Sequence, residues 1–289
     1  MVLESIIGPK KAEKKPFDLF FVGFLYASVA MFLSLWIFRD QTSLVMVFLT
    51  VMAALPLVYE TMKYEERKDS SNSSEYKLLK EHSKALSFLI FLFLGTVVSF
   101  SLWYILLPEK IVDSVFNTQI STIKNINANI FGIDIVTSQY INSSNLFGQI
   151  FSNNLKVFLF SIFFSFFFGA GALFILIWNA SVISTAIGNF FRVNISEYAS
   201  TFGFIKFAGY FHIYSLGLLR YFIHGIPEIL AYFVGGLAGG IISIAVTRHE
   251  VGTKEFTKVL IDSIDLIIIA VALLFVAGLL EVYVTPLFF

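Results

Sequence analysis

Apolar residues occur along this chain in long runs, separated by short polar segments. A helix needs about 20 mostly apolar residues to cross the hydrocarbon core of a bilayer, which is about 30 Å thick. Seven runs reach or approach that length, at 17–38, 44–59, 85–107, 155–178, 202–222, 226–246 and 264–284. The pattern therefore predicts an all-α, polytopic integral membrane protein with about seven transmembrane helices.

Two parts of this pattern are ambiguous. The run 202–222 contains Lys206, His212 and Arg220, whose side chains must face protein or water because exposing them to lipid is costly. If this run is re-entrant, six helices span the membrane. We interpret His212 as a hydrogen-bonded core histidine rather than a ligand. The weaker segment 179–200 is predicted to be a short re-entrant or interfacial helix.

Small residues mark one helix as a packing element. The run 226–246 begins with Pro227 and contains four glycines spaced so that a neighbouring helix can approach closely, namely Gly235, Gly236, Gly239 and Gly240. This spacing suits packing within the chain or the seam of a homo-oligomer. The sequence leaves both open.

The polar segments divide the chain into regions. Residues 1–62 comprise an N-terminal tail and a first helix pair, and the charge-rich residues 63–84 are predicted to be a solvated cytoplasmic loop. Residues 85–289 form the main membrane domain, which includes a polar outer loop at 108–154. Apolar residues recur at helical spacing from Ile111 to Ile130, so we predict an amphipathic helix there, lying on the membrane or on a partner protein.

Composition agrees with a membrane protein and excludes several functions. Hydrophobic residues make up 57% and charged residues 14% of the chain, against roughly 45–50% and 25% in soluble domains. Because the formal net charge is zero, no global basic field favours nucleic acid. The chain has no cysteine, which excludes disulfides, thiolate metal sites and cysteine nucleophiles. The implied partners are the lipid bilayer and other membrane or envelope proteins.

Lysine and arginine in the short loops predict the orientation. The N-terminal tail, the segments 61–84 and 248–258, and Arg192 are basic, whereas 109–154 has two lysines and no arginine. Seven spans with a cytoplasmic N-terminus place the basic groups inside and the C-terminus outside, in a cell membrane.

Several polar residues fall within or at the ends of apolar runs. We expect a helix to begin near Gly225, which would put His224 at its cap and Glu228 one turn later, and Glu281 has no cationic neighbour in sequence. The predicted topology brings the outer ends of three spans together, with Asn153, Asn154, His224, Glu228, Glu281 and Thr285. Arg220, His224 or an asparagine could be the partner of Glu281. A structural capping role and a proton or ion site both fit this pattern.

No metal centre, cofactor or enzyme motif is implied. A metal site usually needs three or four ligands, and only His224 and two carboxylates are available. Zinc-protease, phosphate-loop, serine-hydrolase and dinucleotide motifs are missing, so we expect no enzyme activity, with intramembrane catalysis as a minor alternative.

From Asn153 onward the chain resembles the stage II sporulation protein M family of membrane proteins. The resemblance rests on the asparagine pair before a glycine-containing helix, on His224-Gly225-x-x-Glu228, and on the late Glu281 with Thr285-Pro286. It implies that the family's characteristic positions are Asn154, Asn179, His224, Gly225, Glu228 and Glu281. The first helix pair looks like an addition to the family.

The resemblance implies a biological role but no specific biochemical activity. The family member of endospore formers resembles a membrane scaffold that anchors secreted peptidoglycan hydrolases during engulfment. We therefore expect an integral membrane scaffold or assembly protein that uses its outer loop as a docking surface. A transporter or channel for a small solute or ion, built on the polar cluster, is the alternative.

Overall fold

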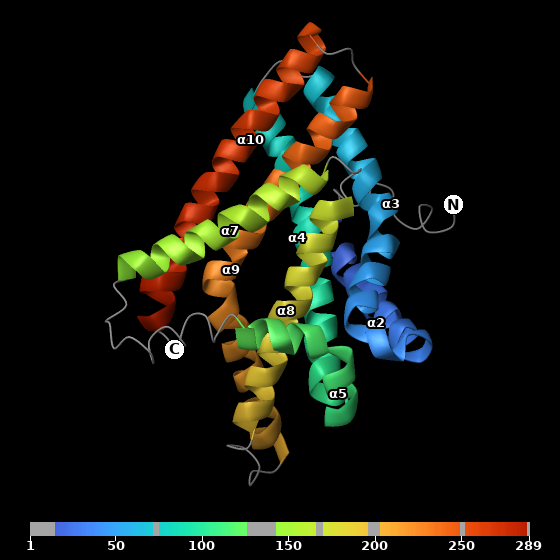
Figure 1. The fold of residues 1–289 in the computed structure, drawn as a ribbon, viewed down its shortest axis with the longest axis vertical. Coiled ribbons are helices and arrows are strands. Elements are labelled where there is room, and N and C mark those ends of the chain that lie inside the picture. The colour runs from blue at the N-terminus through green and yellow to red at the C-terminus, as the bar shows by residue number, and fades with distance from the viewer. Residues whose placement is uncertain are drawn as a thin grey trace.

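The structure is a computed structural model that describes residues 15–71, 75–125, 143–165, 170–195, 203–248 and 252–287. All regular secondary structure in those ranges is helical, and seven helices are long and apolar enough to cross a membrane (Figure 1). The predicted all-α polytopic membrane fold is therefore confirmed, although several helix boundaries differ from the prediction.

The described parts of the chain consist of helices and short helical turns. Residues 117–125 are helical and carry no label in Figure 1. The labelled elements are α2 (Asp18–Ile37), the 3-10 turn η1 (Arg39–Gln41), α3 (Thr42–Ser71), α4 (Glu75–Leu106), α5 (Glu109–Val115), α7 (Ser143–Ser165), α8 (Ala170–Asn194), α9 (Gly203–Arg248), α10 (Lys254–Leu279), a π-helical turn (Leu280–Val284) and a 3-10 turn (Thr285–Leu287).

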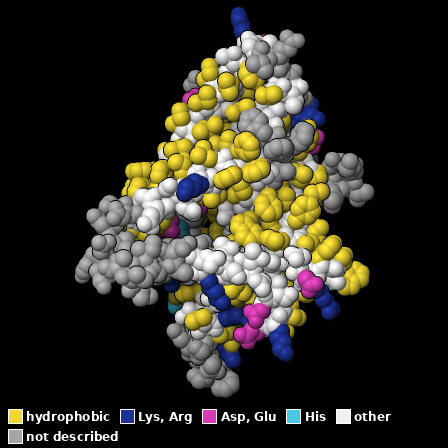
Figure 2. All heavy atoms as spheres, viewed as in Figure 1, with side chains coloured by type: hydrophobic (Ala, Val, Ile, Leu, Met, Phe, Trp, Pro, Cys, Tyr) yellow, Lys and Arg dark blue, Asp and Glu magenta, His cyan; other side chains and the backbone are white. Residues whose placement is uncertain are grey.

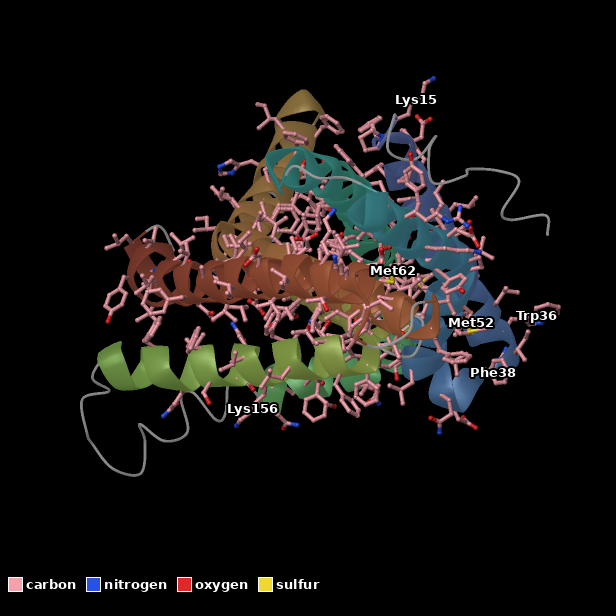
Figure 3. All side chains as sticks on the ribbon, turned by 90° about the horizontal axis from the view of Figure 1, so that it is seen from above. Lys15, Trp36, Phe38, Met52, Met62 and Lys156 are labelled. Atoms are coloured by element: carbon pink, nitrogen blue, oxygen red, sulfur yellow. The ribbon has the colours of Figure 1, made fainter. Side chains whose placement is uncertain are left out.

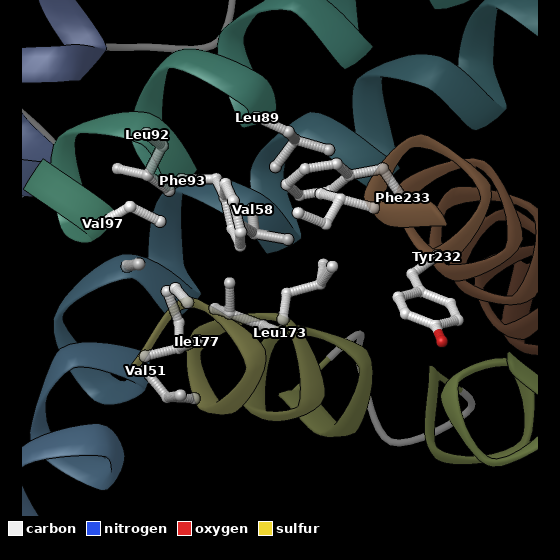
Figure 4. Packing of buried hydrophobic residues seen from close by; sticks show 14 of the residues in the cluster. Val51, Val58, Leu89, Leu92, Phe93, Val97, Leu173, Ile177, Tyr232 and Phe233 are labelled. Carbon is white, nitrogen blue, oxygen red and sulfur yellow. The ribbon is translucent and has the colours of Figure 1, made fainter. Parts of the chain in front are cut away.

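Both the core and the outer surface are apolar, as expected of a bundle surrounded by lipid. Side chains of α3, α4, α8 and α9 meet in the core, including Val58, Phe93 and Ile177 (Figure 4). At the periphery Trp36 is 76% exposed, and Figure 3 places it on the outside of the bundle. Yellow hydrophobic side chains are likewise spread over the upper and middle parts of the face in Figure 2.

Helix α2 packs closely on α4 through small residues. A Cβ atom at Gly23 would overlap the backbone of Leu92, so only glycine permits this approach. Ser28 Oγ lies 2.8 Å from Ser99 Oγ and accepts a hydrogen bond of 2.9 Å from Trp103 Nε1. The first helix thus shares one core with the later ones.

Helix α9 joins two predicted spans, so the prediction of a helix start near Gly225 is wrong. The helix runs from Gly203 to Arg248, 46 residues, with Pro227 inside it. Proline removes one backbone hydrogen bond, but membrane helices tolerate this because neighbouring helices pack around the site. At 1.5 Å per residue α9 is about 69 Å long, longer than the roughly 40–45 Å of a whole bilayer, so its first turns need not lie in hydrocarbon.

The predicted span 155–178 is divided between two helices. Helix α7 ends at Ser165 and α8 begins at Ala170, and the two pack together where Gly171 meets Phe164. The segment from 179 is therefore not a separate re-entrant or interfacial helix, because α8 continues to Asn194; residues 196–200 lie outside the described ranges. The split of 155–178 adds one span, and the joining of two predicted spans in α9 removes one, so the total remains seven.

The charge-rich residues 63–84 were predicted to be a loop, and this prediction is wrong. Helix α3 continues to Ser71, through Pro56, and α4 begins at Glu75, so most of this stretch is helical. Lys, Arg and Glu are good helix formers, which outweighs their polarity where the helix leaves the membrane. Glu60 and Lys63, one turn apart, form an ion pair of 3.7 Å.

The amphipathic segment after α4 is helical up to residue 125, as predicted. It packs on its own chain, however, whereas the prediction placed it on the membrane or on a partner protein. Val112, Val115 and Phe116 are buried. The Gln119 Nε2 group donates to Ser43 O at 3.0 Å and to Ser181 Oγ at 3.1 Å. Residues 126–142, the rest of the predicted outer loop, lie outside the described ranges.

Arg192 does not lie at the same end of α4 as the charged segment 63–84. Its guanidinium donates to the carbonyl oxygens of Ile105 and Leu107, at the end of α4. The charged segment 63–84 is at the opposite end of α4, so the prediction that Arg192 joins it on the cytoplasmic side is wrong. Backbone carbonyls at a helix C-terminus attract a cation, which accounts for its position.

Candidate functional site

Three helices, α7, α8 and α9, and the turn that follows α10 surround a cavity of about 350 Å³. Its polar lining comes from distant parts of the chain: α7, α8, α9 and the turn that follows α10. We call it the acidic cavity, and its polar side chains are Gln149, Asn153, Asn154, Asn179, Glu228, Tyr232 and Glu281.

Helix α7 is seated on α10 by aromatic contacts. The ring of Phe275 lies 5.3 Å from that of Phe147 and 6.0 Å from that of Phe151, and both contacts are edge-on. Figure 3 shows α7 beside α10, with Lys156 on the outer side of α7. Since Gln149 and Asn153 are one turn apart, they share a helix face, and both line the cavity.

Glu228 is held by the next turn of its own helix. The Tyr232 hydroxyl donates a hydrogen bond of 2.8 Å to Glu228 Oε1, and Tyr232 is only 1% exposed. Figure 4 shows the Tyr232 ring turned away from the labelled side chains of α4. A buried tyrosine normally bonds its hydroxyl, and here that bond fixes the position of one carboxylate oxygen.

Glu281 lies in the π-helical turn after α10. Such turns are rare and recur at functional sites, because the wider backbone re-aims a side chain. Glu281 makes no hydrogen bond or ion pair with any residue that the structure describes, and it interacts electrostatically with Glu228. Two carboxylates therefore share one cavity, and its described lining contains no Lys, Arg or His.

The carboxamides add unpaired hydrogen-bonding groups. The Nδ2 atom of Asn179 is buried without a hydrogen-bond partner among the described residues. Asn154 is 8% exposed, and its side chain has no hydrogen bond within the described parts of the chain. Buried polar groups are normally bonded, so these two groups are available to a ligand or to water.

His224 lies beside the acidic cavity but is not part of its lining. Its Nδ1 atom is 3.2 Å from Thr285 Oγ1, and the Thr285 hydroxyl also approaches Leu280 O at 3.1 Å. This contact ties the middle of α9 to the C-terminal turn that positions Glu281. Gly225 is buried, but a Cβ atom there would meet nothing within 4 Å, so close packing does not require glycine.

The secondary candidates lie elsewhere. Lys206 Nζ is 5.8 Å from the Tyr210 ring centroid, near the start of α9. His212 is exposed, so its interpretation as a core histidine is wrong; the extra length of α9 removes the need to bury it. Arg220 lines a different cavity from the one that contains Glu281.

The glycine quartet packs inside the chain. Gly235 meets the Phe158 ring, Gly239 meets Ile162 and Ser165, and Gly240 meets Met62, which lies at the centre of the bundle in Figure 3. All four glycines, Gly236 included, are buried in this single chain. They therefore serve intramolecular packing and leave no glycine surface for a homodimer seam.

Sequence reasoning missed two polar members of the lining, Gln149 and Tyr232. Both lie one helical turn from a residue that it selected, Gln149 before Asn153 and Tyr232 after Glu228. Extending each candidate by four positions along its helix would have found them.

Comparison with known proteins identifies the family. A search of curated proteins and a search of solved structures found no match to this chain. Residues 18–286 match the family described as Stage II sporulation protein M, a region that includes α2 and α3, the helix pair interpreted from sequence as an addition. The match covers more than half of the chain, and the chain therefore belongs to the stage II sporulation protein M family.

Proposed function

We propose that this membrane protein binds a small organic cation in the acidic cavity, as the binding step of transport. The supporting observation is that Glu228 and Glu281 face one cavity whose described lining contains no cation. Carboxylates at membrane depth are costly unless a partner neutralises them. An ammonium or guanidinium group of a ligand would supply that partner.

The size and remaining chemistry of the cavity fit a small molecule. A volume of about 350 Å³ lies within the roughly 300–1,000 Å³ of small-molecule sites, whereas one water occupies only about 30 Å³. Asn154 and Asn179 offer donors and acceptors to polar groups of the solute. Among the described residues, no three His, Asp or Glu side chains lie close enough together to hold a metal ion.

Equilibrium binding to the full chain in lipid nanodiscs tests this proposal. The probes are labelled methylamine, putrescine, choline and arginine amide, with succinate as an anionic counterpart. We expect at least one amine to bind and succinate not to bind. Glu228→Gln and Glu281→Gln keep side-chain shape but remove charge, so each weakens amine binding about tenfold or more.

The matched control is Asp265→Asn on α10, because Asp265 is exposed and does not line the acidic cavity. It should change affinity by less than about twofold. The proposal is overturned if none of the four amines binds, or if binding is unaffected by both glutamate substitutions. Uptake of the bound amine into proteoliposomes then separates transport from binding alone.

An integral membrane scaffold or assembly protein is the second candidate, and the exposure of α7 favours it. In the apolar 18-residue stretch of α7 only 17% of the residues are buried, whereas in that of α9 83% are buried. Leu159, Phe160 and Phe163 are 57–62% exposed, a surface that another helix of a partner protein could cover.

Photo-crosslinking in cells tests the scaffold role. A photoreactive residue at Phe163 should give a discrete adduct with one envelope protein, identified by mass spectrometry. The control position is Phe21 on α2, which is equally exposed at 60%. Lipid adducts alone, or the same protein adducts at both positions, would contradict a specific docking surface on α7.

A further inference from the structure

A second cavity, of about 500 Å³, lies where α4 ends, between the helix at 117–125, α8 and α9. We call it the basic cavity. Its lining includes the cations Lys124 and Arg220, and its described lining contains no Asp or Glu. Tyr104, Asn189 and Tyr221 add neutral polar groups.

Aromatic rings and helix ends hold the arginines near this cavity. The Arg220 guanidinium carbon is 5.8 Å from the Phe190 ring centroid. Arg192 lies 5.3 Å from the ring of Tyr104 and donates to the carbonyl of Leu107 at the end of α4. Glu109 and Asp113 are the acidic residues whose charges influence the Tyr104 hydroxyl, and both are exposed. Two cations, Lys124 and Arg220, therefore line the cavity, Arg192 lies beside its Tyr104 wall, and no acidic group occurs among the described residues of the lining.

The basic cavity lies near one end of a membrane span. The apolar part of α4 covers Leu86–Leu106, and Pro108, Glu109 and Lys110 follow it directly. Tyrosine and tryptophan, here Tyr104 and Trp103, are enriched at the depth of lipid headgroups. Figure 2 shows charged side chains, Lys and Arg with Asp and Glu among them, at this lower end of the molecule, below the more hydrophobic surface.

We propose that the basic cavity binds the phosphate group of an anionic ligand. Lys124 and Arg220 pair with the phosphate charge, and the Asn189 amide and the tyrosine hydroxyls donate to its oxygens. Ile120, Ile123 and Val193 line the same cavity and suit an acyl chain, which makes an anionic phospholipid the favoured source. This inference does not depend on cation binding in the acidic cavity.

Native mass spectrometry of the full chain in detergent, titrated with lipids, tests this inference. Phosphatidylglycerol should bind about fivefold or more tightly than phosphatidylcholine, whose choline opposes the lysine and arginine charges. Lys124→Gln should weaken phosphatidylglycerol binding about threefold to tenfold. Because Lys124 is exposed, this variant should fold, whereas Arg220→Gln also removes a contact with Phe190 and serves as the supporting variant.

The matched control is Lys110→Gln, which removes the same charge from an exposed residue of α5 that does not line the basic cavity. Inorganic phosphate forms the second arm of the experiment. If phosphate binds with the same dependence on Lys124 and phosphatidylglycerol does not, the phosphate site stands and its ligand is soluble. Equal binding of the two lipids together with no phosphate binding, or equal effects of Lys124→Gln and Lys110→Gln, would overturn the site.

Discussion

The two cavities of this protein have opposite charge. The acidic cavity collects Glu228 and Glu281 with three asparagines, and no cation occurs in its described lining. The basic cavity collects Lys124 and Arg220, and its described lining contains no carboxylate. Both are lined by α8 and α9, so the same two helices present acidic surroundings at one place and basic surroundings at another.

The separation shows why net charge says little about a membrane protein. Twenty basic and twenty acidic side chains cancel over the whole chain. Inside a bundle, charges do not average, because a low dielectric strengthens each local field. The sign of the charge in each cavity, rather than the net charge of the chain, determines which ligand the cavity can hold.

The largest effect is expected from reversing one charge of the acidic cavity. Glu281→Lys places an ammonium group beside Glu228, which it can neutralise in the way that we propose for a ligand. Amine binding should therefore fall about a hundredfold or more, which corresponds to roughly 2.7 kcal/mol. Equilibrium binding of the amine identified for the unsubstituted chain measures this change.

Phosphatidylglycerol binding supplies the internal control, because Glu281 does not line the basic cavity. Asp265→Lys on the preceding helix, α10, controls for adding a lysine outside the acidic cavity. If Glu281→Lys binds the amine as well as the unsubstituted chain does, the acidic cavity is not the binding site. Loss of both ligands together would indicate a general loss of structure rather than a local one.

A smaller effect is expected from disturbing the packing of α9 on α7, two of the helices that line the acidic cavity. A Cβ atom at Gly235 would overlap the ring of Phe158, a fully buried residue of α7. Gly235→Ala should therefore lower the free energy of unfolding by about 1–3 kcal/mol, because the core cannot absorb an added methyl group without moving α7. Thermal unfolding in detergent measures the change.

The control for Gly235→Ala is the other glycine substitution in the same helix, Gly225→Ala. Space is open around Gly225, and alanine favours helix by about 0.5–1 kcal/mol relative to glycine. The control should therefore be neutral or slightly stabilising. Equal destabilisation by the two substitutions would mean that the position of α7 does not depend on close approach to α9.

Hydropathy predicted the helical membrane fold and the number of spans. It did not predict that 155–178 is divided between α7 and α8, or that 202–222 and 226–246 belong to one helix, α9. One error came from polar residues near the start of α7, and the other from a proline inside α9. Gln149, Asn153 and Asn154 make the start of α7 look like a loop, yet they line the acidic cavity. In α9 Pro227 looks like a helix start, yet packing continues the helix through it. A sequence states polarity but not the neighbour that each side chain meets.

The candidate site was predicted in a similar, partial way. Asn154, Asn179, Glu228 and Glu281 lie around one cavity, and the predicted topology had brought three of these four together. The partner of each group could not be predicted. His224 meets Thr285 rather than Glu228, and Glu228 meets Tyr232, because which side chains touch depends on how α9 and the C-terminal turn are rotated. Helical spacing gives the neighbours within one helix but not the contacts between two.

The smallest effect is expected from Tyr232→Phe, which tests whether the hydrogen bond to Glu228 matters separately from the carboxylate charge. The substitution removes the hydroxyl that donates to Glu228 Oε1 at 2.8 Å and keeps the buried ring. Because a single hydrogen bond contributes about 0.5–1.5 kcal/mol, amine affinity should fall roughly twofold to tenfold, well below the loss from Glu281→Lys. The matched control is Tyr214→Phe in the same helix, which removes a hydroxyl 2.7 Å from Ser101 Oγ and outside the acidic cavity. If Tyr232→Phe abolishes amine binding while unfolding stays normal, the hydroxyl must contact the ligand itself, and the cavity recognises its solute by more than charge.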